Sequence, residues 1–352
     1  MIKIKILNPH GSDAMDNFCD RNRDDFAKLY RVKDMLRDYS IDITESDDYD
    51  YLFVGMSDFI DKKVSLKRSI EKGLENLSKI TGDYFLFDGS DSTSLMGSYE
   101  VFKESKAIYL FKNQLLKKRE MYNTPYAFGK WFFGSGSDLD LAYDIPKDVW
   151  KRIKLSGHNI GYHSYENYLN FQPINTNKTV DVCAIYQAEH KYNEDHKVRN
   201  DLLYTNHRKG AWEHVQNLSN KYDVRTAKLP FQEYINLLHN SKVSISPMGM
   251  GEICFRDFEC MTLGTMIVRP DMSWVNTTPN IYVDGETYIS CKLDWSDLEE
   301  KIEYTIDNFN ELNEKLIINI RKLYEGKYKL ENLCMHWYSI FSELSGIEVN
   351  YD

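Results

Sequence analysis

The residues best suited to chemistry lie in one segment, Ser241–Pro270. Gly249 and Gly251 follow a short apolar stretch and precede a predicted helix that begins at about Glu252. Glycine allows a loop backbone to turn tightly and approach a ligand with no Cβ atom in the way. The free N–H groups and the positive dipole end of a helix N-terminus bind phosphate. The segment therefore predicts a phosphate-binding loop.

Two charged residues follow on the same predicted helix. Arg256 lies one turn in, where its guanidinium can form a bidentate contact with the phosphates. Glu259, at i+3, lies on the same helix face and can accept hydrogen bonds from ribose hydroxyls. The glycine loop, Arg256 and Glu259 lie in an order that matches the parts of a nucleoside diphosphate, from the phosphates to the ribose. The alternative interpretation is a surface ion pair between Arg256 and Glu259 on an ordinary helix.

The elements that must position these residues are a strand before the loop and a strand after the helix. Apolar strand patterns occur at residues 2–7, 50–56, 82–88, 107–112, 180–186, 223–229, 243–246 and 265–268. Helical patterns occur at residues 24–37, 62–77, 194–220, 231–240, 312–323 and 329–344. Strands that alternate with helices predict an α/β fold of doubly wound parallel sheets, and the chain is long enough for two such domains.

The segment resembles the donor-binding motif of GT-B glycosyltransferases, most closely the exostosin-like group. The resembling residues are Ser241, Lys242, Ser246, Pro247, Gly249, Gly251, Arg256, Glu259 and Gly264. The resemblance implies two Rossmann-like domains that face each other across a cleft, with Arg256 on the donor diphosphate and Glu259 on the ribose. It implies a hexosyl- or pentosyltransferase that moves a sugar from a nucleotide sugar to a glycan or other hydroxyl acceptor. Such enzymes work without a metal, so no cofactor is expected.

The polar stretch at residues 173–178 is the expected domain boundary. We predict an N-terminal acceptor domain over residues 1–175 and a nucleotide-sugar domain over residues 176–328. In GT-B folds the last helix crosses back onto the N-terminal domain, which we expect of residues 329–352. Trp337, Tyr338 and Phe341 would suit that packing.

The resemblance also suggests further donor-binding residues. GT-B enzymes often place a cation after the first strand and helix of the second domain, which here gives Arg208 or Lys209; a solvated basic patch is the alternative. Glu252, at the junction of loop and helix, is expected to contact the donor sugar or to complement the helix dipole. Backbone groups of Lys228 and Leu229 are expected to hold the base.

An inverting reaction needs a general base that deprotonates the acceptor hydroxyl. Ligands of doubly wound sheets bind at the carboxyl ends of the strands. The candidates in the N-terminal domain are therefore His10, Asp13, Asp88 and Asp91, with Asp13 preferred. Each is otherwise an ordinary loop or capping residue. The sequence does not decide between inversion and retention.

Two other classes of function compete with this interpretation. Asp138 and Asp140 form a D-x-D pattern after a glycine-serine pair, which is typical of metal-dependent nucleotide-sugar or nucleotidyl transferases. A non-catalytic module that binds a sugar or nucleotide is the third hypothesis.

Composition excludes several partners and compartments. The net charge of −10 argues against a general nucleic-acid binder, which needs a basic surface. No apolar stretch is long enough for a transmembrane segment, and the first residues alternate like a strand rather than a signal peptide. The six cysteines show neither C-x-x-C nor metal-ligand spacing. We therefore expect a cytoplasmic protein.

Overall fold

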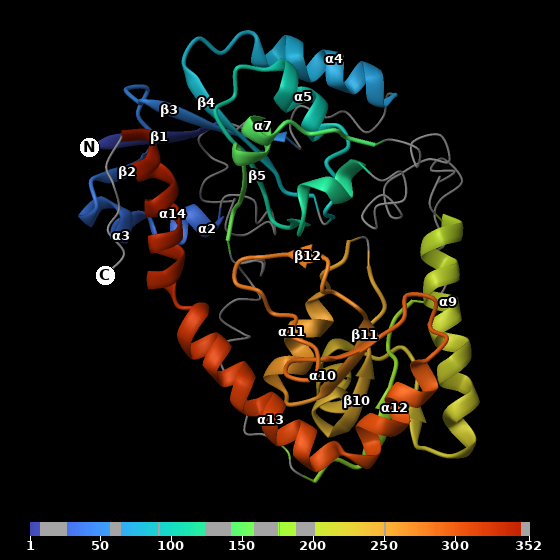
Figure 1. Cartoon of the computed structure of the whole chain (residues 1–352). Helices are drawn as coiled ribbons and strands as arrows, with labels where there is room; N and C mark the ends of the chain where they lie inside the picture. Colours follow the sequence, from blue (N-terminus) through green and yellow to red (C-terminus); the bar gives the residue numbers. More distant parts are fainter. Residues whose placement is uncertain are drawn as a thin grey trace.

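Two α/β units occupy the two halves of the chain in the computed structural model of the protein (Figure 1). The structure describes residues 1–7, 27–56, 65–90, 92–123, 142–157, 175, 177–187, 201–249 and 251–345. Five residues proposed from the sequence lie outside this part of the chain: His10, Asp13, Asp91, Asp138 and Asp140.

Six parallel strands form the first sheet, in the order β2–β1–β3–β4–β5–β7. The strands are β1 (Ile2–Leu7), β2 (Ile41–Thr44), β3 (Tyr51–Gly55), β4 (Asp83–Asp88), β5 (Leu110–Lys112) and β7 (Ile153–Leu155). The helices of this half are α2 (Ala27–Arg31), α3 (Lys33–Asp38), α4 (Leu66–Leu77), α5 (Ser98–Glu104) and α7 (Lys147–Lys151).

Five parallel strands form the second sheet, in the order β13–β11–β10–β8–β9. They are β8 (Val180–Cys183), β9 (Val224–Arg225), β10 (Ser241–Ile245), β11 (Met266–Pro270) and β13 (Ile289–Cys291). The helices are α9 (Asp201–Asn217), α10 (Phe231–Asn240), α11 (Phe255–Thr262), α12 (Leu298–Asp307), α13 (Phe309–Lys322) and α14 (Leu330–Ser345). Counted along the chain, each sheet contains the order 2-1-3-4-5 of doubly wound folds. The predicted fold class, two Rossmann-like α/β units in a GT-B arrangement, is confirmed.

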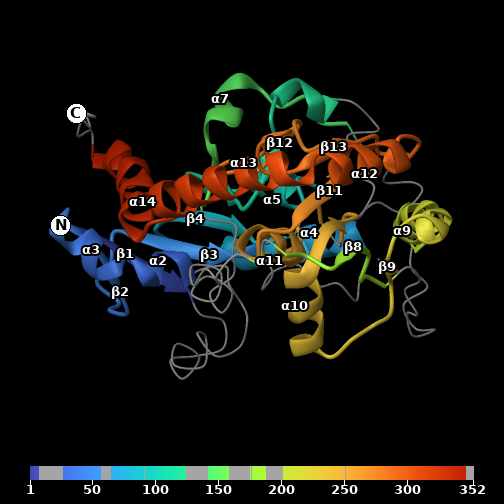
Figure 2. The ribbon, with the colours of Figure 1, turned by 90° about the horizontal axis from the view of Figure 1, so that it is seen from below.

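Alternation along the buried strands gives the first sheet one face rich in aromatic residues. Phe53, Phe85 and Phe111 point to this face and are fully buried. Helix α14 covers them: the ring of Trp337 lies 5.9 Å from Phe53 and 5.1 Å from Phe111, and Phe341 lies 6.0 Å from Phe85. The C-terminal helix therefore packs on the N-terminal sheet, beside α2 and α3 (Figures 1 and 2). None of the described helices is long and apolar enough to cross a membrane.

The two halves are joined by more than the chain. Strand β6 (Leu115–Leu116) of the first half pairs antiparallel with β12 (Val275–Asn276) of the second half, between the two sheets (Figure 1). A single hydrophobic cluster includes Leu86 and Leu110 from the first sheet and Val243 from the second. The interface is thus both hydrogen-bonded and apolar.

Local structure differs from the prediction at several places. Strand β2 and helix α5 were not predicted, since each is short and stabilised mainly by its neighbours. Helix α11 begins at Phe255 rather than at about Glu252. The reason is its N-terminal capping: Cys254 is the N-cap, and its backbone N–H donates to the carboxylate of Asp257. Residues 252–254 therefore belong to the loop.

Replacing Trp337 tests the packing of α14. Trp337→Ala should lower the free energy of unfolding by about 3–5 kcal/mol, since it empties a fully buried site between aromatic rings. Tyr304→Ala, a half-exposed aromatic residue on α12, is the control and should change it by about 0.5 kcal/mol or less. Urea denaturation measures both. A similarly small loss for Trp337→Ala would contradict the packing.

Candidate functional site

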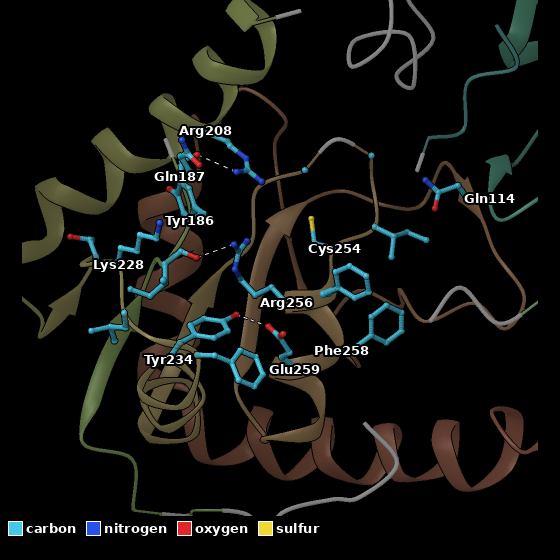
Figure 3. A pocket seen from close by; sticks show the side chains of 18 of the residues that line it. Gln114, Tyr186, Gln187, Arg208, Lys228, Tyr234, Cys254, Arg256, Phe258 and Glu259 are labelled. Atoms are coloured by element: carbon cyan, nitrogen blue, oxygen red, sulfur yellow. Dashed lines mark hydrogen bonds between the residues drawn. The ribbon is translucent and has the colours of Figure 1, made fainter. Parts of the chain in front are cut away.

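A cavity of about 900 Å³ lies at the carboxyl ends of β8 and β10, where the strand order of the second sheet reverses (Figure 3). This is the position where doubly wound folds bind ligands. Seven residues proposed from the sequence line it: Arg208, Lys228, Leu229, Gly249, Gly251, Arg256 and Glu259. Among the described residues, the first half of the chain contributes Asn113 and Gln114, which follow β5.

Helix α9 holds the glycine loop from one side. The N–H of Met248 donates to Nε2 of His207 at 3.3 Å, and Nε of Arg208 donates to the carbonyl of Met248 at 3.0 Å. Burial, reinforced by the positive charge of Arg208, lowers the pKa of His207 to about 3, so the ring is neutral and can accept this bond. Within the loop, the N–H of Gly249 donates to the carbonyl of Gly251 at 3.0 Å. The backbone that lines the cavity is thus fixed to α9.

A buried ion pair holds the loop from below. Asp257, in the first turn of α11, pairs with Arg269 of β11, and neither side chain is exposed. The Asp257 carboxylate also accepts from Oγ of Ser246 at 2.6 Å, and the Arg269 guanidinium donates to the carbonyl of Glu252. The pair therefore ties the end of β10, the loop and the start of α11 together. Sequence reasoning missed it, although a charged residue inside the apolar run of β11 was a signal.

Glu252 does not line the cavity. It is fully buried and accepts from the N–H of Thr93 at 3.0 Å, the hydroxyl of Thr93 at 2.8 Å and Nε2 of Gln114 at 2.7 Å. All three donors come from the first half of the chain. These bonds already use the carboxylate between the two halves, so the structure gives no support to the expected contact of Glu252 with a donor sugar.

Arg256 has unused donors at the cavity. Its Nη2 donates to the carbonyl of Ile185 at 2.9 Å, whereas Nε and Nη1 are buried and have no hydrogen-bond partner among the described residues. A buried N–H without an acceptor is costly, so such a group indicates a missing ligand. Glu259 lines the same cavity and accepts from the hydroxyl of Tyr234 at 2.6 Å (Figure 3).

The two cations proposed after the first helix of the second half have different environments. Arg208 is 8% exposed and lines the cavity, with its guanidinium 6.0 Å from the ring of Tyr186. Lys209 is 55% exposed and lies 3.9 Å from Glu213 on the same helix. Neighbours on a helix point about 100° apart, so only one of the two can face the sheet. Lys209 does not line the cavity, and its surroundings match the alternative interpretation, a solvated surface.

Asp88 does not line the cavity and forms a buried ion pair instead. Its carboxylate accepts from Nζ of Lys112, which is fully buried, at 2.7 Å. Burial alone would raise the pKa of Asp88, but the charge and hydrogen bond of Lys112 outweigh it and hold the pKa below its usual value. A carboxylate in this state is a weak base. Asp88 therefore has a structural role at the end of β4, and the structure gives no support to its proposed role as catalytic base.

Several cavity residues were not predicted. Tyr186 and Gln187 end the strand pattern at 180–186 or follow it, and Asn113 and Gln114 follow the pattern at 107–112. The rule that ligands bind at the carboxyl ends of strands would have found these residues. No sequence pattern indicated that Tyr234 would line the cavity. Phe231 and Phe255 also line the cavity, and they are 70% and 58% exposed, which is unusual for large aromatic side chains.

No protein-family description matches the sequence, and no curated protein is detectably similar to it. Among solved structures, a glycosyltransferase from Rickettsia africae covers 99% of this chain and of its own, at 12% identity and a TM-score of 0.44. Anabaena Alr3699/HepE in complex with UDP-glucose covers 99% of this chain and 100% of its own, at 10% identity and a TM-score of 0.45. An alpha-glucosyltransferase in complex with UDP-glucose and DNA containing an abasic site covers 98% and 99%, at 10% identity and a TM-score of 0.46. Sequence identities this low give no information on which ligands this protein binds or on which of its residues take part in a reaction.

Removal of the Glu252 carboxylate should loosen the junction between the two halves. Glu252→Ala leaves the N–H of Thr93 and the amide of Gln114 buried without their acceptor, so we expect the free energy of unfolding to fall by about 3 kcal/mol. Glu252→Gln keeps one acceptor oxygen and adds an N–H for the Thr93 hydroxyl, so it should cost much less. Denaturant titration at pH 6 distinguishes the two variants, and equal losses would contradict the assignment.

The same carboxylate should make stability depend on pH. Burial raises the pKa of Glu252 above its usual value. Its contribution to stability is therefore complete below the unfolded-state pKa of about 4.3 and is lost as the pH rises through the folded-state pKa. Since Glu252→Gln cannot ionise, it should gain stability relative to the wild type as the pH rises above the unfolded-state pKa of about 4.3. A pH-independent difference in unfolding free energy would contradict this.

Proposed function

We propose that this protein transfers a hexosyl or pentosyl group from a nucleoside-diphosphate sugar to a glycan or another hydroxyl acceptor. The observation that carries the proposal is the guanidinium of Arg256, whose Nε and Nη1 are buried at the cavity without a partner among the described residues. The exostosin-like subgroup remains part of the proposal, on the motif of residues 241–264.

A diphosphate matches the charge of this cavity. The hydrogen bond shown for Arg256 ends on the carbonyl oxygen of Ile185, which is neutral. The positive charge of Arg256 in a partly enclosed site therefore attracts an anion, and Arg208 lines the same cavity. Guanidinium groups bind phosphate oxygens in a bidentate manner, and the N-terminus of α11 adds its dipole. This interaction would stabilise the charge that grows on a leaving diphosphate.

The remaining lining residues suit the rest of a nucleotide sugar. Glu259 accepts from the hydroxyl of Tyr234 and in this proposal also accepts from ribose hydroxyls. Lys228 and Leu229, after β9, offer backbone groups to a base. The exposed ring of Phe231 provides an apolar surface for a planar group. A volume of about 900 Å³ lies within the range of small-molecule sites.

The first half of the chain would present the acceptor. Asn113 and Gln114 line the cavity, and Gln114 lies on the side opposite to Arg208 (Figure 3). Neutral amides are suited to hydroxyl groups, since they both donate and accept. In this proposal the arginines neutralise the diphosphate, so no metal is required. Asp13 remains the sequence-based candidate for a general base.

Replacing Arg256 tests the site. Hydrogen bonds to charged groups contribute about 1.5–3 kcal/mol, so Arg256→Ala should raise the Kd for the matching nucleoside diphosphate about 10- to 100-fold. Lys209→Ala removes the same charge from the solvated side of α9 and should leave the Kd unchanged. Isothermal titration calorimetry with UDP, GDP and ADP measures both. Equal affinity in Arg256→Ala and the wild type would contradict the site.

A donor panel tests the reaction. Release of nucleoside diphosphate from UDP-, GDP- and ADP-sugars is measured with a set of hydroxyl acceptors, in EDTA and in Mn²⁺. We expect turnover of one donor in EDTA and formation of a glycosylated acceptor. Turnover in Mn²⁺ but not in EDTA would favour a metal-dependent reaction at Asp138 and Asp140 instead. Binding without turnover in either condition would favour the non-catalytic module.

A further inference from the structure

Tyr186 is a polar residue of the cavity to which neither the motif nor the proposed function assigns a role. It lies just beyond the carboxyl end of β8, at the point where the strand order reverses. Its side chain lines the cavity together with Arg208 and Arg256.

The hydroxyl of Tyr186 is buried and has no hydrogen-bond partner among the described residues. Tyrosine hydroxyls that are buried usually find a partner, because an unsatisfied one costs free energy. Burial also raises the pKa of Tyr186 above its usual value, so the group stays protonated and can donate. It is therefore a donor in need of an acceptor.

The ring of Tyr186 links this donor to the two cations. The guanidinium carbon of Arg256 lies 5.5 Å from the ring centre and that of Arg208 lies 6.0 Å from it. Both distances allow a cation–π interaction. An anion bound beside this ring would lie close to the positive charge of Arg256 and be attracted by it. An anionic oxygen there would also be a suitable acceptor for the Tyr186 hydroxyl.

We infer that the hydroxyl of Tyr186 donates a hydrogen bond to a diphosphate oxygen and makes the site prefer nucleoside diphosphates over monophosphates. The inference rests on the proposed function and refines it. Tyr186 binds the diphosphate as a neutral donor and exchanges no proton. Arg208 and Arg256 supply the charge, and Tyr186 supplies a donor that only a correctly placed phosphate can satisfy.

Tyr186→Phe is the test, because it removes one oxygen atom and keeps the ring and its contacts with both guanidinium groups. The Kd values of UDP, GDP and ADP and of the matching monophosphates are measured by calorimetry for the wild type and the variant. We expect the Kd of the preferred diphosphate to rise about tenfold. The Kd of its monophosphate should change less than about twofold. Tyr304→Phe, on the exposed face of α12, is the inert control.

Each outcome has a distinct meaning. An unchanged diphosphate affinity in Tyr186→Phe would overturn the inference and leave the proposed function standing. An equal weakening of diphosphate and monophosphate would also overturn it, since the hydroxyl would then act on the nucleoside or on the fold. A wild-type protein that binds none of the diphosphates would overturn the proposed function and the inference with it. The unfolding temperature of the free variant should not fall below that of the wild type, because Tyr186→Phe removes an unsatisfied buried hydroxyl; this excludes a loss of folding.

Discussion

The buried ion pair between Asp257 and Arg269 is the interaction on which the cavity depends. Two charges removed from water are costly, and the cost is offset only where further hydrogen bonds satisfy both groups. Here Ser246 donates to the Asp257 carboxylate, and the Arg269 guanidinium donates to Tyr282 and to the carbonyl of Glu252. These contacts join the end of β10, the glycine loop, the first turn of α11 and strand β11. Because Arg256 is the second residue of α11, these contacts also fix its position.

The loop is also held by the other half of the chain. Glu252 receives three hydrogen bonds from Thr93 and Gln114, and β6 pairs with β12 nearby in the same interface. Gln114 has two roles, because it lines the cavity and also holds Glu252. Any opening of the cleft at this point must break these bonds and expose a buried carboxylate. The geometry of the anion site is therefore coupled to the contact between the halves, which favours a preformed site over one assembled by closure.

Local patterns predicted much of the fold and part of the site. Most of the parallel strands were recognisable as apolar runs, although β2 and β7 were not predicted. The glycine loop with Arg256 and Glu259 follows from a strand, a turn and a helix that are contiguous in sequence. Residues whose role depends on distant partners were not predictable. Glu252 and Thr93 are separated by 159 positions, and no local pattern shows that they meet. Asp88 is an ion-pair residue only because β4 and β5 are neighbours, which places Lys112 beside it. The arrangement of Tyr186 with two arginines depends in the same way on β8, α9 and α11 together.

The most direct measurement is a crystal structure of the protein with its preferred nucleoside diphosphate, grown in the presence of Mn²⁺. We predict phosphate oxygens within hydrogen-bonding distance of Nε and Nη1 of Arg256, with the ribose beside Glu259. In this position the nucleotide would satisfy the donors that the described residues leave unpaired. Phosphates bound through a metal ion to Asp138 and Asp140, with the cavity at Arg256 free of nucleotide, would contradict the central claim.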